Sequence, residues 1–208
     1  MKIKDITINK LKSGKLKKEL SDFYELKKII ENNSWHNNES TFKHVIAVLM
    51  ELEKFFKNNK NNKIGEYLNK KINNYCRKDL LFLATVLHDL GKKETIIING
   101  DISSFPKHEK ISVKKTKIIL KKFILSQKEK DIICGIINKH SDLHVIVNEN
   151  NKNLKKQFDK LIELSKLFLI ELIIMVMADT ATSYLKRTNR EEYDFRINFY
   201  KNILYRIF

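Results

Sequence analysis

The sequence predicts an all-α helical bundle with one small β-hairpin insert. Only five glycines and one proline interrupt the 208 residues, which favours long helices over a many-stranded β-sandwich. Apolar residues make up 42% of the chain and recur mostly at helical spacing. The exception is residues 95–105, where β-branched residues precede Asn99-Gly100, a dipeptide typical of tight hairpin turns. The length suits one domain, so we expect residues 1–208 to fold as a single unit.

The first half of the chain is expected to hold four helices. Residues 15–32 carry apolar side chains at helical spacing, which predicts the first of them. Ser40 can cap a second helix that runs to about residue 56. The polar, low-complexity sequence KNNKNNK then predicts an exposed loop. Residues 64–75 and 79–90 are predicted to form the next two helices.

Helices are also predicted after the hairpin. Residues 109–123 return to a helical pattern. Ser126 and Glu129 form a capping box that begins a further helix, which we expect to end at about Lys139. The polar sequence HSDLH that follows is expected to be a loop.

The C-terminal part contains the most apolar run of the sequence, residues 167–178. It has 12 residues and includes Glu171, so it is too short to span a bilayer and predicts a buried core helix. One or two helices are expected over residues 154–186, and Asn189 can cap a last one through Ile203.

The charge of the chain is strongly positive. Its 41 Lys and Arg residues exceed its 25 Asp and Glu residues, giving a net charge of +16 that attracts anionic partners. The lysines are spread along the chain among many asparagines and isoleucines. We therefore expect a solvated basic surface with weak nucleic-acid binding, rather than a dedicated nucleic-acid groove.

The two cysteines do not predict a disulfide framework. Cys76 and Cys134 are far apart in sequence and both lie in helical contexts. The first twenty residues lack the apolar segment of a signal peptide. A reduced, cytoplasmic setting without membrane contact is therefore expected.

The histidines are the candidate functional residues. All six fall between positions 36 and 144, several of them where predicted helices begin or end: His36, His44, His88, His108, His140 and His144. Asp179 follows the apolar run, where an unpaired carboxylate would be costly. Imidazole and carboxylate groups together suit Zn, Fe, Mn, Ni or Co. No short motif such as HExxH is present, so metal ligands would have to converge from distant helices. Ordinary buried or surface histidines are the alternative.

The pair His88-Asp89 ends an apolar run just before Gly91. An isolated pair of this kind is more often a hydrogen-bonded core histidine beside a solvated aspartate. The other motifs change this interpretation. In chain order they are His44, HDLGK (88–92), FPKHE (105–109), a helix ending near His140, and ADTATSYLKR (178–187). This order resembles the HD-domain superfamily of metal-dependent phosphohydrolases over roughly residues 35–190. The HE dipeptide after a hairpin resembles the HD domains found beside tRNA nucleotidyltransferases and in related stand-alone proteins.

The resemblance implies an all-helical domain that binds one or two divalent transition metal ions: Mn, Fe, Ni, Co or Zn. The residues at the positions of the first metal are His44, His88, Asp89 and Asp179. His108 and His140 match the positions of the second metal, and Asp89 would bridge the two ions. The implied activity is hydrolysis of a nucleotide or another phosphoester, mono- or diester, by metal-activated water.

Three further residues are expected to act on the substrate. Lys92 follows Gly91 and is expected to contact phosphate or to support the Asp89 carboxylate. Arg187 lies eight residues after Asp179, two helical turns on, so it can face the same cleft and bind phosphate. His36 is expected to point into this cleft as well. We therefore assign catalysis to Asp89, Lys92 and Arg187, and substrate binding to Lys92, His36 and Arg187.

The sequence also departs from several branches of the superfamily. There is no GYP triplet, and His140 is followed by Ser141 rather than a second histidine, which argues against a cyclic-di-GMP phosphodiesterase. No nucleotidyltransferase domain is recognisable, so a stand-alone protein with its own phosphorylated substrate is expected. The alternatives are a nucleic-acid-binding or RNA-processing HD protein, and a non-catalytic interaction domain with a structural metal.

Overall fold

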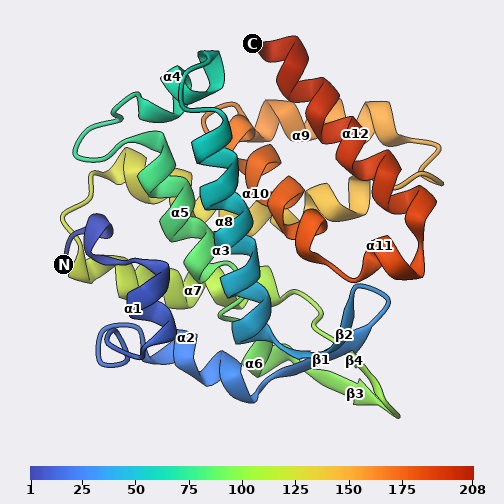
Figure 1. The fold of residues 1–208 in the computed structure, drawn as a ribbon, viewed down its shortest axis with the longest axis horizontal. Coiled ribbons are helices and arrows are strands. Elements are labelled where there is room, and N and C mark those ends of the chain that lie inside the picture. The colour runs from blue at the N-terminus through green and yellow to red at the C-terminus, as the bar shows by residue number, and fades with distance from the viewer.

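The computed structural model describes all 208 residues and shows a helical bundle with two small antiparallel hairpins (Figure 1). The all-α prediction is confirmed. The α-helices are α1 (Ile8–Lys12), α2 (Ser21–Glu25), α3 (Thr41–Asn58), α4 (Lys63–Asn69), α5 (Arg77–Leu87), α6 (Lys92–Thr95), α7 (His108–Ile119), α8 (Gln127–Ile146), α9 (Leu154–Ser165), α10 (Leu169–Thr182), α11 (Leu185–Thr188) and α12 (Arg190–Ile207). Short 3-10 turns cover Ile3–Asp5, Leu26–Lys28 and Leu120–Lys122. The strands are β1 (Ile30–Asn33), β2 (His36–Ser40), β3 (Ile97–Asn99) and β4 (Ile102–Ser104).

Helix α10 lies at the centre of the bundle. It packs against α3, α5, α8 and α12 (Figure 1). Every residue from Glu171 to Thr180 is buried, which explains the most apolar run of the sequence. Within it, Glu171 is neutralised by an ion pair with Arg77 and accepts a hydrogen bond from the Tyr67 hydroxyl. The apolar core is one cluster of 43 buried side chains. Because protein cores are closely packed, the side chains of α10 are held in fixed positions.

Three long helices begin where their capping residues predict. The Ser40 hydroxyl accepts a hydrogen bond from the Lys43 backbone N–H at the start of α3. Ser126 and Glu129 form the predicted capping box of α8. Asn189 caps α12 through its side chain. These contacts satisfy backbone donors that an uncapped helix would leave without a partner.

The two hairpins lie together at the lower edge of Figure 1. The β3–β4 hairpin is the predicted one, and Gly100 has a φ of +58°, as a tight turn of this kind requires. The β1–β2 hairpin replaces the end of the helix that we predicted over residues 15–32, so that prediction is wrong. Strand β1 is held by β4, because the Asn32 backbone N–H donates to the Ser103 hydroxyl at 2.8 Å. This contact joins residues 71 positions apart in the sequence, and it outweighs the local preference for a helix.

Two further boundaries differ from the predictions. Helix α4 ends at Asn69, and the chain then forms an isolated bridge between Lys71 and Cys76, so the helix predicted over residues 64–75 is half its expected length. Helix α8 continues to Ile146, so the HSDLH sequence is helical and the loop prediction there is wrong. This extension places His144 one helical turn after His140, on the same face.

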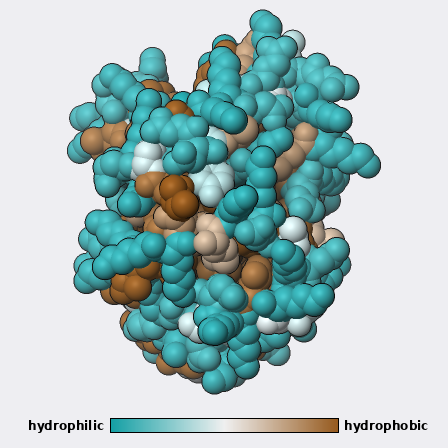
Figure 2. All heavy atoms as spheres, turned by 90° about the vertical axis from the view of Figure 1, so that its left-hand side faces the viewer, coloured by the Kyte–Doolittle hydropathy of each residue, from teal (hydrophilic) through white to brown (hydrophobic).

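The surface is mostly polar. Figure 2 shows one face of the molecule, largely hydrophilic and broken by small apolar patches. None of the helices combines the length and the hydropathy needed to cross a bilayer. Cys76 and Cys134 are both free thiols, in agreement with the sequence analysis.

Candidate metal centre

Most of the predicted site residues meet in one cavity of about 230 Å³. Its lining residues are Trp35, His36, His44, Asp89, Lys92, His108, His140, Ser141, His144, Val145 and Asp179. They come from β2 and the turn before it, from α3, α6, α7, α8 and α10, and from the turn that follows α5. Distant parts of the chain therefore converge here, as a site without a short sequence motif requires.

One group of donor atoms is formed by His44, His88 and Asp179. One ligand atom from each lies within 4.8 Å of the others, a spacing at which a metal ion could be held. The His44 Nε2 atom is 2.8 Å from Asp179 Oδ1. All three side chains are buried. Asp179 is fixed by the core helix α10, and His44 is fixed by the first turn of α3.

A second group lies around Asp89. His88, Asp89 and His140 also satisfy the spacing of metal ligands. His108 joins them, because its Nε2 atom is 3.2 Å from Asp89 Oδ1. The other oxygen, Asp89 Oδ2, is 3.2 Å from His88 Nε2. The two oxygens of Asp89 thus face different histidines, which is the arrangement that a bridging carboxylate needs.

Three histidines of the centre share one orientation. In each, the Nδ1 atom contacts the backbone carbonyl three residues earlier: His88 with Thr85 (2.7 Å), His108 with Phe105 (2.9 Å) and His140 with Ile137 (2.7 Å). A carbonyl oxygen only accepts hydrogen bonds, so Nδ1 carries the proton. In the neutral rings, the Nε2 lone pairs then point into the centre, as in histidine ligands of metal sites.

This orientation tests whether the residues fit a metal ion. The Nε2 atoms of His108 and His140 are 3.0 Å apart, and each presents a lone pair to the other when both rings are neutral. Two nitrogens bound to one ion at about 2.0–2.1 Å lie about 2.9–3.4 Å apart. The buried Nε2 atom of His88 also lacks a hydrogen-bond partner. A divalent cation would satisfy these lone pairs, and the mixed imidazole and carboxylate donors suit a first-row transition metal.

Two carboxylates and one imidazole of the centre are held in the protonation states that bind a cation. Burial opposes ionisation of Asp89, but the charges of His88 and Lys92 outweigh it and hold the pKa of Asp89 well below its usual range. Burial likewise raises the pKa of Asp179, but hydrogen bonds from His144 and His44 hold it well below the usual value. Burial and the charges of His108 and His88 lower the pKa of His140. The centre therefore offers ionised carboxylates and, at His140, a neutral imidazole.

Gly91 lets the HD turn approach the next helix. Its backbone N–H donates to the Ser112 hydroxyl of α7 at 2.8 Å. A side chain at position 91 would collide with the backbone carbonyl of His108 and with the backbone of Ser112. The absence of a side chain therefore allows the turn that carries Asp89 to lie directly against the helix that carries His108.

Lys92 and His36 reach the cavity but are engaged with carboxylates. The Lys92 ammonium lies 2.9 Å from Asp89 Oδ2 and 2.8 Å from Glu31 Oε2. This contact matches the second of the two roles expected for Lys92, support of the Asp89 carboxylate. His36 Nε2 is 3.2 Å from Glu31, and its Nδ1 is 3.1 Å from Glu39. Neither ring nitrogen of His36 is free to meet a substrate.

Arg187 does not reach the cavity. Helix α10 ends at Thr182, so the expectation that Arg187 shares a helix face with Asp179 is wrong. Arg187 lies on the separate short helix α11, is exposed, and places its guanidinium over the Tyr184 ring. The eight-residue spacing that suggested its role has no structural meaning, because the chain turns between the two residues.

The sequence interpretation gave His144 no role in the site. Its Nε2 atom is 2.8 Å from Asp179 Oδ2, opposite the contact of His44 with Oδ1. Because a carboxylate accepts, His144 donates from Nε2 and fixes the orientation of Asp179. Its spacing of four from His140 was the available signal, and reading HSDLH as a loop concealed it. Glu31 and Glu39 were also missed, since they lie in the unpredicted hairpin.

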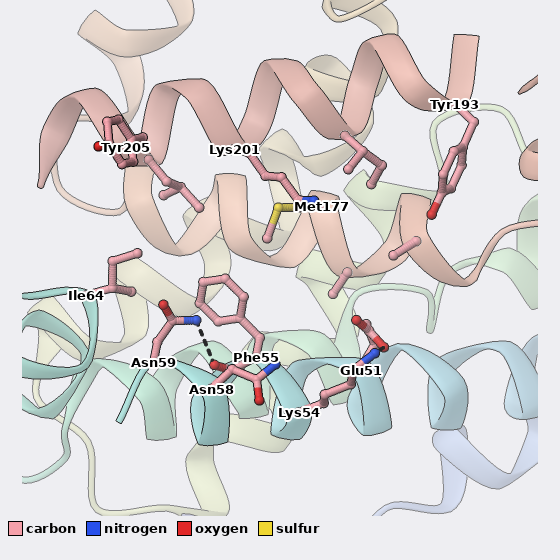
Figure 3. Close-up of a pocket in the computed structure, with 14 residues that line it drawn as sticks. Glu51, Lys54, Phe55, Asn58, Asn59, Ile64, Met177, Tyr193, Lys201 and Tyr205 are labelled. Carbon is pink, nitrogen blue, oxygen red and sulfur yellow. Dashed lines mark hydrogen bonds and ion pairs between the residues drawn. The ribbon is translucent and has the colours of Figure 1, made fainter. Parts of the chain in front are cut away.

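A larger cavity lies on another side of α10. A groove of about 560 Å³ runs between α3 and α12, with α10 as its floor (Figure 3). Nine of its fourteen lining residues are hydrophobic, among them Phe55 and Met177. It contains no histidine, so it offers none of the imidazole ligands that gather around Asp89.

Comparison with known proteins supports the family assignment. The family model described as HD domain matches residues 41–179. The chain therefore belongs to the HD-domain family. A search of curated proteins found no match. The match begins just before His44 and ends at Asp179, so it spans every residue proposed here as a metal ligand. The closer resemblance to the HD domains beside tRNA nucleotidyltransferases stays a prediction.

Proposed function

We propose that this HD-domain protein is a metal-dependent phosphohydrolase that acts on a nucleotide or another phosphorylated small molecule. One observation carries the proposal. Three histidines hold Nδ1 against backbone carbonyls and aim Nε2 at a buried aspartate, in a cavity open to a small ligand. Family membership supports the same chemistry.

We assign the donors to two metal positions that share Asp89, as the family resemblance implies. The first would be held by His44, His88, Asp89 and Asp179. The second would be held by Asp89, His108 and His140. Bound divalent ions supply an acidified water as nucleophile and positive charge for the phosphoryl oxygens.

The protein's own residues would orient these ligands and neutralise charge. Lys92 holds Asp89 Oδ2, which leaves Oδ1 directed at His108. His144 and His44 hold the two oxygens of Asp179. Such a preorganised set needs no rearrangement when charge develops on the phosphate, which is the main source of electrostatic catalysis. The positive charge of the chain would also favour the approach of an anionic substrate.

The size of the cavity limits which substrates can bind. Its volume of about 230 Å³ is below the roughly 300–1,000 Å³ of sites that enclose a drug-sized ligand. A phosphate group fits, whereas the remainder of a nucleotide would lie toward the mouth, where Val145 is exposed. This favours a terminal phosphate over an internal diester of a polymer.

The experiment is a panel of phosphoesters with defined metal loading. Chelator-treated protein is reloaded with Mn, Fe, Ni, Co or Zn and given nucleoside monophosphates, cyclic nucleotides and simple aryl mono- and diesters. Metal-dependent release of phosphate or alcohol that stops on addition of chelator is the expected result. Metal binding without turnover of any substrate would contradict the proposal and favour a non-catalytic domain with a structural metal.

A further inference from the structure

The β1–β2 hairpin contributes two carboxylates to the edge of the metal centre. It spans residues 30–40 and precedes the region matched by the family, which begins at residue 41. Glu31 and Glu39 are direct cross-strand partners in this hairpin. Like charges placed opposite each other on one face of a sheet are destabilising. Their placement therefore calls for cations or donors between them, and the structure supplies these from the centre itself.

Glu31 acts on Asp89 through Lys92. Glu31 is fully buried, and its Oε2 atom accepts a hydrogen bond from the Lys92 ammonium at 2.8 Å. The same ammonium is 2.9 Å from Asp89 Oδ2. A buried ammonium is costly unless carboxylates compensate it. Glu31 thus fixes the position of Lys92, and Lys92 in turn fixes the rotation of the Asp89 carboxylate.

Glu39 acts on His44. The Nδ1 atom of His44 is buried and has no hydrogen-bond partner, unlike the carbonyl-bound Nδ1 atoms of the other three histidines. Glu39 Oε1 lies 4.0 Å from it, so a small movement would close a hydrogen bond. A carboxylate on the outer nitrogen of a ligand histidine fixes its tautomer and raises its basicity.

His36 joins the two carboxylates. Its Nε2 atom faces Glu31 Oε2 at 3.2 Å, and its Nδ1 atom faces Glu39 Oε1 at 3.1 Å. Its ring also packs edge-on against the ring of His44, with centroids 4.4 Å apart. Close contacts therefore lead from Asp89 through Lys92, Glu31 and His36 to Glu39, whose Oε1 atom lies 4.0 Å from His44 Nδ1.

We propose that the β1–β2 hairpin is a positioning device for the metal centre. Glu39 holds the outer nitrogen of His44, Glu31 holds the shared ligand Asp89 through Lys92, and His36 ties the two carboxylates together. The inference rests on the proposed metal centre but not on hydrolysis. His36 is then a positioning residue rather than the substrate ligand that the sequence suggested.

A competing arrangement uses the same atoms. His36, Glu39 and His44 also satisfy the spacing of metal ligands, so they could hold an ion themselves. The two arrangements differ in stoichiometry. Positioning predicts no metal beyond the two positions of the centre, whereas direct ligation predicts a further ion that is lost when Glu39 loses its charge.

The test is calorimetric titration of chelator-treated protein with Co²⁺, combined with the visible spectrum of the bound ion. Glu39→Gln should weaken the binding of one ion by about 10–100-fold, the usual cost of removing an outer partner of a ligand, and leave the other unchanged. Glu31→Gln should weaken both ions, because Asp89 is shared. A general loss of structure would not weaken one ion selectively, and the Co²⁺ spectrum reports the altered ligand field directly.

Glu25→Gln is the matched control. Glu25 pairs with Lys93, the neighbour of Lys92, on the exposed surface, and it does not line the cavity. This variant should bind both ions like the wild type. If Glu31→Gln does not fold, Glu31→Asp keeps the charge but shortens its reach, and it should show the same loss. Glu39 is partly exposed, so Glu39→Gln should fold.

Three results would overturn the inference. The first is Co²⁺ affinity in Glu39→Gln within about twofold of the wild type at both positions. The second is loss of an additional ion in Glu39→Gln, which would make Glu39 a ligand. The third is wild-type protein that takes up no ion, which removes the centre itself. Absence of phosphoester turnover would contradict only the proposed function, since every readout here is metal binding.

Discussion

Two cavities lie on either side of helix α10, and they differ in size and in chemistry. The groove beside Met177 and Ala178 has a volume of about 560 Å³, and nine of its fourteen lining residues are hydrophobic. The cavity beside Asp179 has a volume of about 230 Å³, and only two of its eleven lining residues are hydrophobic. Neighbouring residues of α10 thus line two different cavities: Met177 and Ala178 line the apolar groove, and Asp179 lines the polar cavity.

The comparison teaches that composition, rather than size, locates the chemistry. An apolar groove costs the fold little, because its side chains also pack against the core. The small cavity holds buried carboxylates and imidazoles, whose desolvation is expensive. The buried Nε2 atom of His88, which faces Asp89, has no hydrogen-bond partner. A divalent cation bound beside Asp89 would complete this nitrogen.

The largest expected effect is at Asp89. Asp89→Asn keeps the size of the side chain but removes the charge shared by both metal positions. Metal affinity and any phosphoester turnover should fall by more than the roughly 10–100-fold cost of losing an outer partner. The metal-free protein should remain folded. Calorimetric titration and a melting curve in chelator measure the two effects, and unchanged metal affinity would return His88-Asp89 to an ordinary structural pair.

A second prediction concerns pH. Burial lowers the pKa of His44, but the hydrogen bond and charge of Asp179 outweigh it and raise the pKa to about 9. An incoming ion must displace this proton, so metal affinity should rise about tenfold per pH unit between pH 6.5 and 8.5. In the metal-free protein, by contrast, the stability of the fold should decrease as pH rises. Stability from this raised pKa is fully present below about pH 6.5 and is lost as pH rises through about 9.

The pH prediction is checked by melting curves with and without metal. The melting temperature of the metal-free protein should fall as pH rises, and the gap to the metal-loaded protein should widen. A gap that narrows from pH 6.5 to 8.5 would show that His44 is not the residue that gives up a proton. The groove between α3 and α12 has no histidine, so substitutions there should leave the pH dependence of the melting temperature unchanged.

The smallest effect is expected in the groove. Met177→Leu changes the floor of the groove two residues from Asp179 while conserving volume, so the stability loss should stay below about 1.5 kcal/mol. Metal affinity and turnover should match the wild type. Denaturant unfolding together with Co²⁺ titration tests this. A tenfold change in metal affinity would mean that the two cavities are coupled through α10 rather than independent.

The features that the sequence predicts well depend on local chemistry. The caps Ser40 and Asn189 each act within three residues, so their helices begin where expected. The Asn99-Gly100 turn is equally local. The β1 strand is different, because its pairing with β2 and its bond to Ser103 depend on the folded chain. No spacing rule applied to residues 15–32 could reveal that contact.

The candidate site was predictable only in part. The ligand set around Asp89 followed from the order of motifs and the resemblance that they support. His144 was missed because five mostly polar residues suggested a loop, although the helix continues through them. Arg187 was included because residue spacing was carried across a helix end at Thr182. Glu31 and Glu39 depend on the unpredicted hairpin, so only the three-dimensional arrangement could bring them to the centre.

The small polar cavity beside Asp179 should bind metal ions. The most direct test is titration of the chelator-treated wild-type protein with Mn, Fe, Ni, Co and Zn, with the melting temperature followed at each step. We predict two ions per chain and a stabilisation of about 2.7 kcal/mol per site when free metal reaches 100 times Kd. Failure of all five metals to bind or to raise the melting temperature would show that this cavity is not a metal centre.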